Sequence, residues 1–290
     1  MTTRCPICSC SDLMVFARLR TPYLDRKESY EIMQCRGCGH GFAVGRDDRE
    51  FLGRIYSSGF HETSQQAADE DASPIRVNAR ARVEWLHGLG IGGRLLDIGA
   101  GTGAFVEAAS AVFDVEGVEL ASGVAAAAAA KGLPILCGDF LSMEFPKKSY
   151  DIVTLWDVLA SLRDPHAALE RCRSLVRDGG HVVMTLPMID SLAARVLKRT
   201  WPLLIPPVNL HFFSRRSVIF LANHHGLDVS SVSFPGKRVA LNFLALKAGR
   251  SLGMHGLAHQ LARTFPPASV RINTGDIACV RLQRRPASSP

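Results

Sequence analysis

The sequence predicts an α/β fold in which helices cover both faces of a mostly parallel sheet. The first observation is the segment Arg94–Phe105, where a short apolar run ends in an acid and leads through a glycine-rich turn into a helix start. The second is Tyr150–Asp157, whose apolar run suits a parallel strand that is buried on both faces. The third is the alternation of strand-like and helix-like segments between and beyond these two.

The turn after the first strand has the composition of a loop that holds a nucleotide-containing cofactor. Glycine permits positive φ angles and lets a ligand lie against bare backbone, and three glycines stand here, Gly99, Gly101 and Gly103. A helix expected over Ala104–Ala111 would offer its N-terminal amides to the same ligand. The turn alone leaves two cofactors open, because Gly99, Gly101 and Ala104 also satisfy the dinucleotide fingerprint, with Glu119 about 20 residues on.

Acids also end the next two predicted strands. Val115–Leu120 reads as a strand that ends at Glu119, whose carboxylate could accept hydrogen bonds from both ribose hydroxyls. Ile135–Phe140 reads as a third strand that ends in Asp139 and an aromatic residue. Chain that would place a substrate against a nicotinamide is not evident, which weakens the dinucleotide alternative.

The spelling of Leu96–Gly103, LDIGAGTG, resembles the first motif of class I S-adenosylmethionine-dependent methyltransferases, and the three later strands follow in that family's order. The resemblance implies a Rossmann-like seven-stranded sheet of order 3-2-1-4-5-7-6, with the last strand antiparallel and the cofactor at the strands' carboxyl ends. In the family, the acid at Asp139 takes the adenine amino group and Phe140 lies beside the ring. The resemblance thus implies S-adenosylmethionine as cofactor, held by Asp97, Gly99, Ala100, Gly101, Gly103, Glu119, Asp139, Phe140 and Trp156.

The N-terminus carries a second strong pattern, in which Cys5-Pro-Ile-Cys8 is matched by Cys35-Arg-Gly-Cys38. Two such pairs can present four thiolates to one tetrahedral ion, so this spacing predicts a zinc ribbon with a structural Zn²⁺. A module of about 40 residues has too little core to fold unaided, and the metal would supply the missing stability. Disulfides are the rival, which adjacent C-x-x-C pairs disfavour, and we expect Cys10 and His40 to be bystanders.

Composition divides the chain into a small module and one large domain. The stretch between them changes in character, and we expect a short helix and a loop that folds over the cofactor cleft, with Tyr56 lining the substrate pocket. The predicted division is a zinc ribbon at 1–45, a linker or lid at 46–75, the methyltransferase domain at 76–285 with a substrate-side insertion at about 187–214, and a disordered tail at 286–290.

The second half of the domain is expected to complete the sheet. Asp164-Pro165 predicts a helix start, and a strand is expected at His181–Leu186. Leu227–Phe234 and Gly275–Leu282 read as the last two strands, and Val239–Arg263 as helical with an apolar face.

Trp201–Ser214 resembles a substrate-side segment of one methyltransferase branch, which includes sugar and small-molecule enzymes and often carries a zinc ribbon. His211 in this segment is the expected catalytic base, because an imidazole titrates near working pH. The alternative is that His211 orders its loop by a hydrogen bond to the backbone. Many relatives place Glu-His in the loop after the fourth strand, where this chain has Ala160-Ser161. His224 and His225 end a helix, where the helix dipole explains them.

The predicted function is methyl transfer from S-adenosylmethionine to a small-molecule acceptor, such as a sugar or another secondary metabolite. The formal charge of +7 and the pI near 9.1 keep ribosomal RNA as an alternative acceptor. The basic residues are scattered, which disfavours nucleic acid, and a non-catalytic cofactor-binding scaffold is the third reading. Because neither a signal region nor a bilayer-length apolar stretch is evident, we expect a cytoplasmic protein without membrane contact.

Overall fold

The structure, a computed structural model, describes residues 3–23, 26–46, 50–51, 73–241 and 268–286. Tyr56 and most of the expected lid lie outside these residues, as does nearly all of the expected tail. In the described part, no helix is long and apolar enough to cross a membrane.

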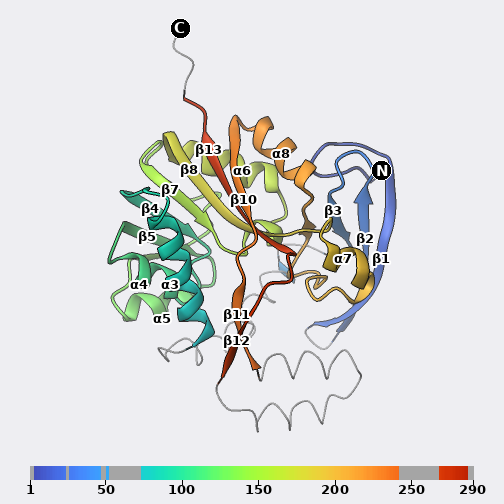
Figure 1. The fold of residues 1–290 in the computed structure, drawn as a ribbon, viewed down its shortest axis with the longest axis horizontal. Coiled ribbons are helices and arrows are strands. Elements are labelled where there is room, and N and C mark those ends of the chain that lie inside the picture. Colours follow the sequence, from blue (N-terminus) through green and yellow to red (C-terminus); the bar gives the residue numbers. More distant parts are fainter. Residues whose placement is uncertain (1–2, 24–25, 47–49, 52–72, 242–267, 287–290) are drawn as a thin grey trace.

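The described residues form a seven-stranded sheet of order β10-β13-β8-β7-β4-β5-β6, shown in Figure 1. Strands β6, β5, β4, β7 and β8 run parallel, and β13 is antiparallel to both β8 and β10. This confirms the predicted order 3-2-1-4-5-7-6 and its antiparallel last strand. The strands are β4 (Arg94–Ile98), β5 (Asp114–Glu119), β6 (Ile135–Cys137), β7 (Tyr150–Leu155), β8 (Val176–Pro187), β10 (Leu227–Ser233) and β13 (Ile277–Arg284).

Helices cover both faces of this sheet because its central strands are apolar on both faces. Leu95 packs in the core under α3 (Pro74–His87), α4 (Ala104–Ala109) and α5 (Ser122–Ala130). Its neighbour Leu96 packs in the opposite core, under α6 (Pro165–Leu175) and α8 (Arg215–His224). Figure 1 shows the two helix layers on either side of the sheet.

The helices on the second face begin where their side chains cap them. The Asp164 carboxylate accepts hydrogen bonds from the amides of His166 and Ala167, at 2.9 and 3.0 Å, and Pro165 stands in the first turn. Ser214 and Ser217 form a reciprocal capping box at the start of α8. Strand β8 begins at Val176, earlier than the expected His181, because Val176 already pairs with Tyr150 at the start of β7.

A four-stranded sheet at the N-terminus has the order β1-β2-β3-β9. Its first three strands are consecutive in sequence, whereas β9 comes from the segment between β8 and α8, so the small module is built into the large domain. The strands are β1 (Leu13–Tyr23), β2 (Arg26–Cys35), β3 (Gly41–Val44) and β9 (His211–Phe212). Three short helices lie near the segment between β8 and α8, either in the chain or in space. They are α7 (Leu192–Leu197), η2 (Lys198–Thr200) and η1 (Leu159–Ser161).

The prediction of a helix beginning at Val239 is wrong. The structure has strand β11 (Lys237–Ala240), paired antiparallel with β12 (Ser269–Ile272). The Asn78 side chain on α3 holds β11 from the other side, since its amide donates to the Arg238 carbonyl at 2.9 Å and accepts from the Arg238 amide at 2.8 Å. Both partners of β11 are distant in sequence, so local propensity could not predict it. Residues 242–263 of that predicted helix lie outside the described residues.

Candidate functional site

The loop after β4 fits a ligand that lies against its backbone. Gly99, Gly101 and Gly103 have φ angles of +74°, +55° and +83°, which favour glycine. A Cβ added at Gly99 would come within 2.5 Å of Val158 Cγ2, while one at Gly101 would meet no atom within 4 Å. Gly99 and Gly103 are thus required by close packing, and Gly101 leaves bare backbone facing open space.

Glu119, at the end of β5, is positioned by the same loop. Its side chain is buried, and its two oxygens accept hydrogen bonds from the backbone amides of Gly101 and Ala121, both at 2.8 Å. A carboxylate offers about four lone-pair sites, so each oxygen can still accept one hydroxyl. This geometry suits an acid that holds a vicinal diol such as a ribose.

Asp97 lies beneath the loop and outside the lining of the cleft. Its side chain is 2% exposed and accepts a hydrogen bond from Thr154 Oγ1 at 2.7 Å. Burial raises the pKa of Asp97 to about 7, although the Thr154 hydrogen bond and the charge of Arg82 oppose that rise. A cation bound above the loop would favour the ionised form.

A cleft of about 430 Å³ opens at the carboxyl ends of β4, β5, β6 and β7. The predicted cofactor residues that line it are Gly99, Glu119, Asp139, Phe140 and Trp156, whereas Asp97, Ala100, Gly101 and Gly103 lie outside its lining. The opposite wall is mostly apolar and comes from the expected substrate-side segment, through Leu203, Ile205, Val208 and Asn209, and from the loop Val158–Leu162.

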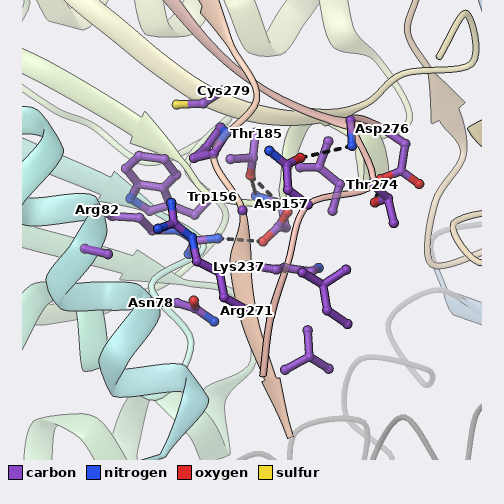
Figure 2. Close-up of a pocket in the computed structure, with 18 of the residues that line it drawn as sticks. Asn78, Arg82, Trp156, Asp157, Thr185, Lys237, Arg271, Thr274, Asp276 and Cys279 are labelled. Atoms are coloured by element: carbon purple, nitrogen blue, oxygen red, sulfur yellow. Dashed lines mark hydrogen bonds and ion pairs between the residues drawn. The ribbon is translucent and has the colours of Figure 1, made fainter. Parts of the chain in front are cut away.

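A second cavity of about 260 Å³ adjoins the first, and Figure 2 shows its lining. The two share Trp156 and Asp157, which follow β7, together with Lys237 and Ile277. The Trp156 ring packs edge-on against Phe105 and beneath the Arg82 guanidinium, which lies 4.7 Å from its centroid. Its Nε1 is buried and has no hydrogen-bond partner among the described residues.

Asp157 is fixed in an unusual backbone conformation at this junction. Its φ is +62°, uncommon for a residue with a side chain and frequent at functional sites. Its carboxylate accepts hydrogen bonds from Arg82 Nη2 and Thr185 Oγ1, both at 2.9 Å, while its own amide donates to Thr185 Oγ1 at 2.7 Å. The side chain is 57% exposed, so a molecule in the cavity can reach it.

The charges around Asp157 keep it ionised. Partial desolvation by the cavity walls would raise its pKa, but the charges of Arg82 and Lys237 and the Thr185 hydrogen bond outweigh that effect and lower the pKa below its usual range. Arg82, Asp157 and Lys237 were not among the site residues predicted from the sequence. Asp157 had the same signal as Glu119, an acid directly after a buried strand, whereas Arg82 and Lys237 offered no local signal.

The structure does not place His211 in the lining of either cavity. His211 lies on β9 and is buried outside both linings. Its Nδ1 lies 3.1 Å from Nε2 of His40, which follows β2 in the chain. Burial lowers the pKa of His211 to about 4, against the opposing effect of the Arg163 and Leu162 backbone. A buried histidine in contact with this backbone is what the alternative predicts, in which His211 orders its segment.

The four predicted cysteines converge, with all Sγ atoms within 4.8 Å of one another. The Cys5 and Cys38 sulfurs are 3.6 Å apart, as are those of Cys8 and Cys35, and all four are free thiols. Tetrahedral bonds of about 2.3 Å to zinc separate two sulfurs by about 3.8 Å, so the cluster could hold such an ion. Cys10 and His40 do not belong to it.

Comparison with known proteins identifies the domain. A family model described as a methyltransferase domain matches residues 60–232, which is more than half of the chain. The chain belongs to this methyltransferase family. This membership agrees with the sheet order and with a cleft at the carboxyl ends of the strands.

Individual relatives of this methyltransferase are distant. The ubiquinone biosynthesis O-methyltransferase of Bordetella avium is 32% identical over 129 residues, which cover 39% of this chain and 52% of that protein. The chain thus spans about half the length of the curated relative it matches.

Two solved structures share the fold at low identity. Magnesium protoporphyrin IX methyltransferase of Synechocystis, with bound S-adenosylhomocysteine, is 14% identical with a TM-score of 0.56, over 82% of this chain and all of that one (100%). A S-adenosylmethionine-dependent methyltransferase of Thermotoga maritima is 17% identical with a TM-score of 0.52, over 80% of this chain and 99% of that one.

Proposed function

We propose that this methyltransferase transfers a methyl group from S-adenosylmethionine to a hydroxyl oxygen of a small, partly apolar molecule. The observation that carries the proposal is the wall shared by the two cavities, Trp156-Asp157 at the carboxyl end of β7. One wall of the cleft contains the residues expected to hold the cofactor, and the acceptor would lie between the opposite wall of the cleft and the adjoining cavity. The methyl group would pass at the junction of the two cavities.

Each cofactor residue contacts a different part of the ligand. Bound S-adenosylmethionine supplies a methyl group made electrophilic by a positively charged sulfur. Glu119 accepts the two ribose hydroxyls, Asp139 accepts the adenine amino group, and Phe140 packs beside the ring. The backbone at Gly101 lets the ligand approach the loop, and Asp97 beneath it adds negative charge.

Asp157 orients the acceptor. A displacement at a methyl group depends mainly on bringing the two reactants into line, so the enzyme must hold the hydroxyl oxygen and take up its proton. The Asp157 carboxylate is ionised and held by Arg82 and Thr185, and it accepts the hydrogen bond of the acceptor hydroxyl. As the hydroxyl oxygen becomes an ether oxygen, the Asp157 carboxylate takes its proton and releases it to water in the open cavity. His211 positions the cleft wall and does not act as the base.

The acceptor class follows from the lining. Leu203, Ile205, Val208 and Ile277 offer apolar contact to a ring or chain, while Lys237 and Asn209 offer polar contact. The oxygen-methylating relative supports an oxygen acceptor for this chain too. A sugar remains an acceptor to be included in the test.

The N-terminal cysteines hold one structural Zn²⁺, in a ribbon that spans 1–45. The sulfur spacing and the free thiols support this. Four thiolates close a tetrahedral site and leave no position for water, so the ion takes no part in catalysis. Metal analysis of purified protein is expected to find about one zinc per chain in this cluster, and less than about half would contradict the proposal.

A methylation assay with S-adenosylmethionine labelled in the methyl group tests the function. Hydroxylated aromatic compounds, sugars and ribosomal RNA are offered in parallel, and label is expected in a small-molecule oxygen ether. Asp157→Asn should lower kcat by about 100-fold while cofactor affinity stays within about threefold. The matched control is Asp228→Asn, which removes another arginine-paired carboxylate on distant β10 and should leave kcat unchanged.

Two outcomes would contradict the proposal. Label in RNA alone would favour the RNA alternative. Cofactor binding by calorimetry without label in any acceptor would favour the non-catalytic scaffold.

A further inference from the structure

Three histidines from two helices converge outside the lining of both cavities. His166 lies in the first turn of α6, His224 ends α8 and His225 follows it. One ring nitrogen of each lies within 4.8 Å of the other two, and the ring centroids are 5.0 to 5.1 Å apart. Neither the methyltransferase reaction nor the cysteine cluster uses them.

The hydrogen bond of His166 to the backbone fixes which ring nitrogen carries the proton in the neutral form. Its Nε2 lies 2.9 Å from the carbonyl oxygen of Ile7, and a carbonyl only accepts, so Nε2 carries the proton. In the neutral ring, Nδ1 then has a free lone pair, and this atom lies 3.0 Å from Nε2 of His225. A histidine whose second nitrogen donates to a backbone carbonyl has the arrangement that metal-binding histidines usually show.

The spacing of the nitrogens matches a small divalent ion. Bonds of about 2.05 Å at tetrahedral angles separate two nitrogens by about 3.3 Å, so a separation of 3.0 Å needs only a small shift. His224 is exposed while the other two are half-buried, so a fourth position faces solvent and can take water. Imidazole donors favour zinc, nickel and copper over calcium or magnesium.

Simpler explanations cover only part of this cluster. The dipole of α8 accounts for histidines at positions 224 and 225, because a helix C-terminus attracts positive charge. It does not account for His166, which comes from another helix 59 residues away from His225. Nearby charges of both signs act on His225, from Glu170 and Arg173, so they do not bar a cation.

We propose that His166, His224 and His225 form a second metal site, which binds Zn²⁺ and fastens the first cysteine knuckle to α6 and α8. The link is direct, because the Ile7 carbonyl, which accepts the hydrogen bond from His166 Nε2, belongs to a residue between Cys5 and Cys8. An ion in this site would hold the N-terminal module against the domain. A three-nitrogen site with open water also exchanges its metal more readily than a closed four-sulfur site.

Calorimetric titration of the full-length, zinc-replete protein with Zn²⁺ tests the site. We expect one further equivalent beyond the ion in the cysteines, bound with a Kd in the micromolar range or tighter (about 10⁻⁶ M). His224→Gln and His225→Gln should each raise the Kd for this further equivalent by at least about 10-fold. His87→Gln, which replaces another exposed histidine at a helix end, should leave it unchanged.

Thermal unfolding supplies an independent readout. Added Zn²⁺ should raise the Tm of the wild type and the His87 variant but not of the His224 variant. Because His224 is exposed, its variant is expected to fold, and its Tm without added metal checks this. A further equivalent weaker than about 1 mM, or one that His224→Gln leaves unchanged, would overturn the site. Binding of S-adenosylmethionine is a separate measurement, so the methyltransferase assignment does not depend on the result.

Discussion

The two walls of the cleft are built in different ways. The cofactor wall comes from residues close to their strand ends, such as Glu119, which the Gly101 amide holds by a hydrogen bond across 18 positions of the sequence. The acceptor wall depends on distant pairs: Trp201 Nε1 donates to Asp276 across 75 positions, and His211 meets His40 across 171. The shape of the cofactor wall is set by hydrogen bonds near the strand ends, and the shape of the acceptor wall is set by packing between distant segments. Substitutions should therefore separate cofactor binding from acceptor binding.

The largest effect is expected from Gly99→Ala on the cofactor wall. The new Cβ would meet Val158 Cγ2 at 2.5 Å, and the residue would keep a φ of +74°, so the loop must move. We expect cofactor affinity to fall by more than about 100-fold, measured by calorimetry.

Gly132→Ala is the matched control, because it has a φ of +78° and open space around its Cβ. It should destabilise the fold by about 1 kcal/mol and leave cofactor affinity unchanged. Equal losses in the two variants would show that backbone strain, and not the loop's packing, controls binding.

The next effect is a pH dependence centred on Asp97. Its folded pKa of about 7 lies above its unfolded value of 3.8, so the folded state holds the proton more tightly. The contribution of Asp97 to stability is therefore present below pH 4 and is lost as the pH rises to about 7.

Between pH 5 and pH 8, Asp97 should lower the free energy of unfolding by about 2 to 3 kcal/mol, measured in urea. Asp97→Asn should remove this slope, and an unchanged slope would place its origin elsewhere. Cofactor binding near pH 7 should also release a proton in the wild type.

Glu119→Ala should lower cofactor affinity by about 10- to 100-fold, because the ribose hydroxyls lose their acceptor. Glu116→Gln on the same strand is the control, since Glu116 pairs with Arg94 and Tyr150 and does not line the cleft. Unchanged affinity in the Glu119 variant would remove this residue from the cofactor site.

On the acceptor wall, Trp201→Phe should destabilise the fold by about 1 to 2 kcal/mol, because buried Asp276 loses a donor at 2.7 Å. The KM for the acceptor should rise while cofactor affinity stays the same. A double-mutant cycle with Asp276→Asn should give a smaller combined loss than the sum of the two. Full additivity would show that the pair does not hold the wall.

The smallest effect on turnover is expected from His211→Asn. A catalytic base would cost about 100-fold or more, whereas a positioning residue should cost less than about 10-fold. The variant should lower Tm and leave the pH profile of kcat unchanged in shape. A large loss that is confined to kcat would restore the base role.

Features set by local backbone chemistry could be predicted from the sequence, and features set by contacts between distant segments could not. Glycines at positive φ and acids at strand ends are local requirements, so the sheet order, the cysteine cluster and residues such as Glu119 could be predicted. The strand at Lys237–Ala240 could not, because Asn78 and β12 create it from a distance. Asp157 could have been found from its place after β7, but the cation that fixes it, Arg82, comes from α3.

Strand β9 determines when the N-terminal sheet can finish folding during synthesis. The N-terminal sheet has three strands that leave the ribosome early, and its fourth strand consists of His211–Phe212. At about 5 to 20 residues per second, the delay between β3 and β9 is about 10 to 30 s. During this interval the edge of β3 has no neighbour, and His40 has no His211 to pack against. A module whose first three strands precede the large domain in the chain is therefore among the last parts to be finished.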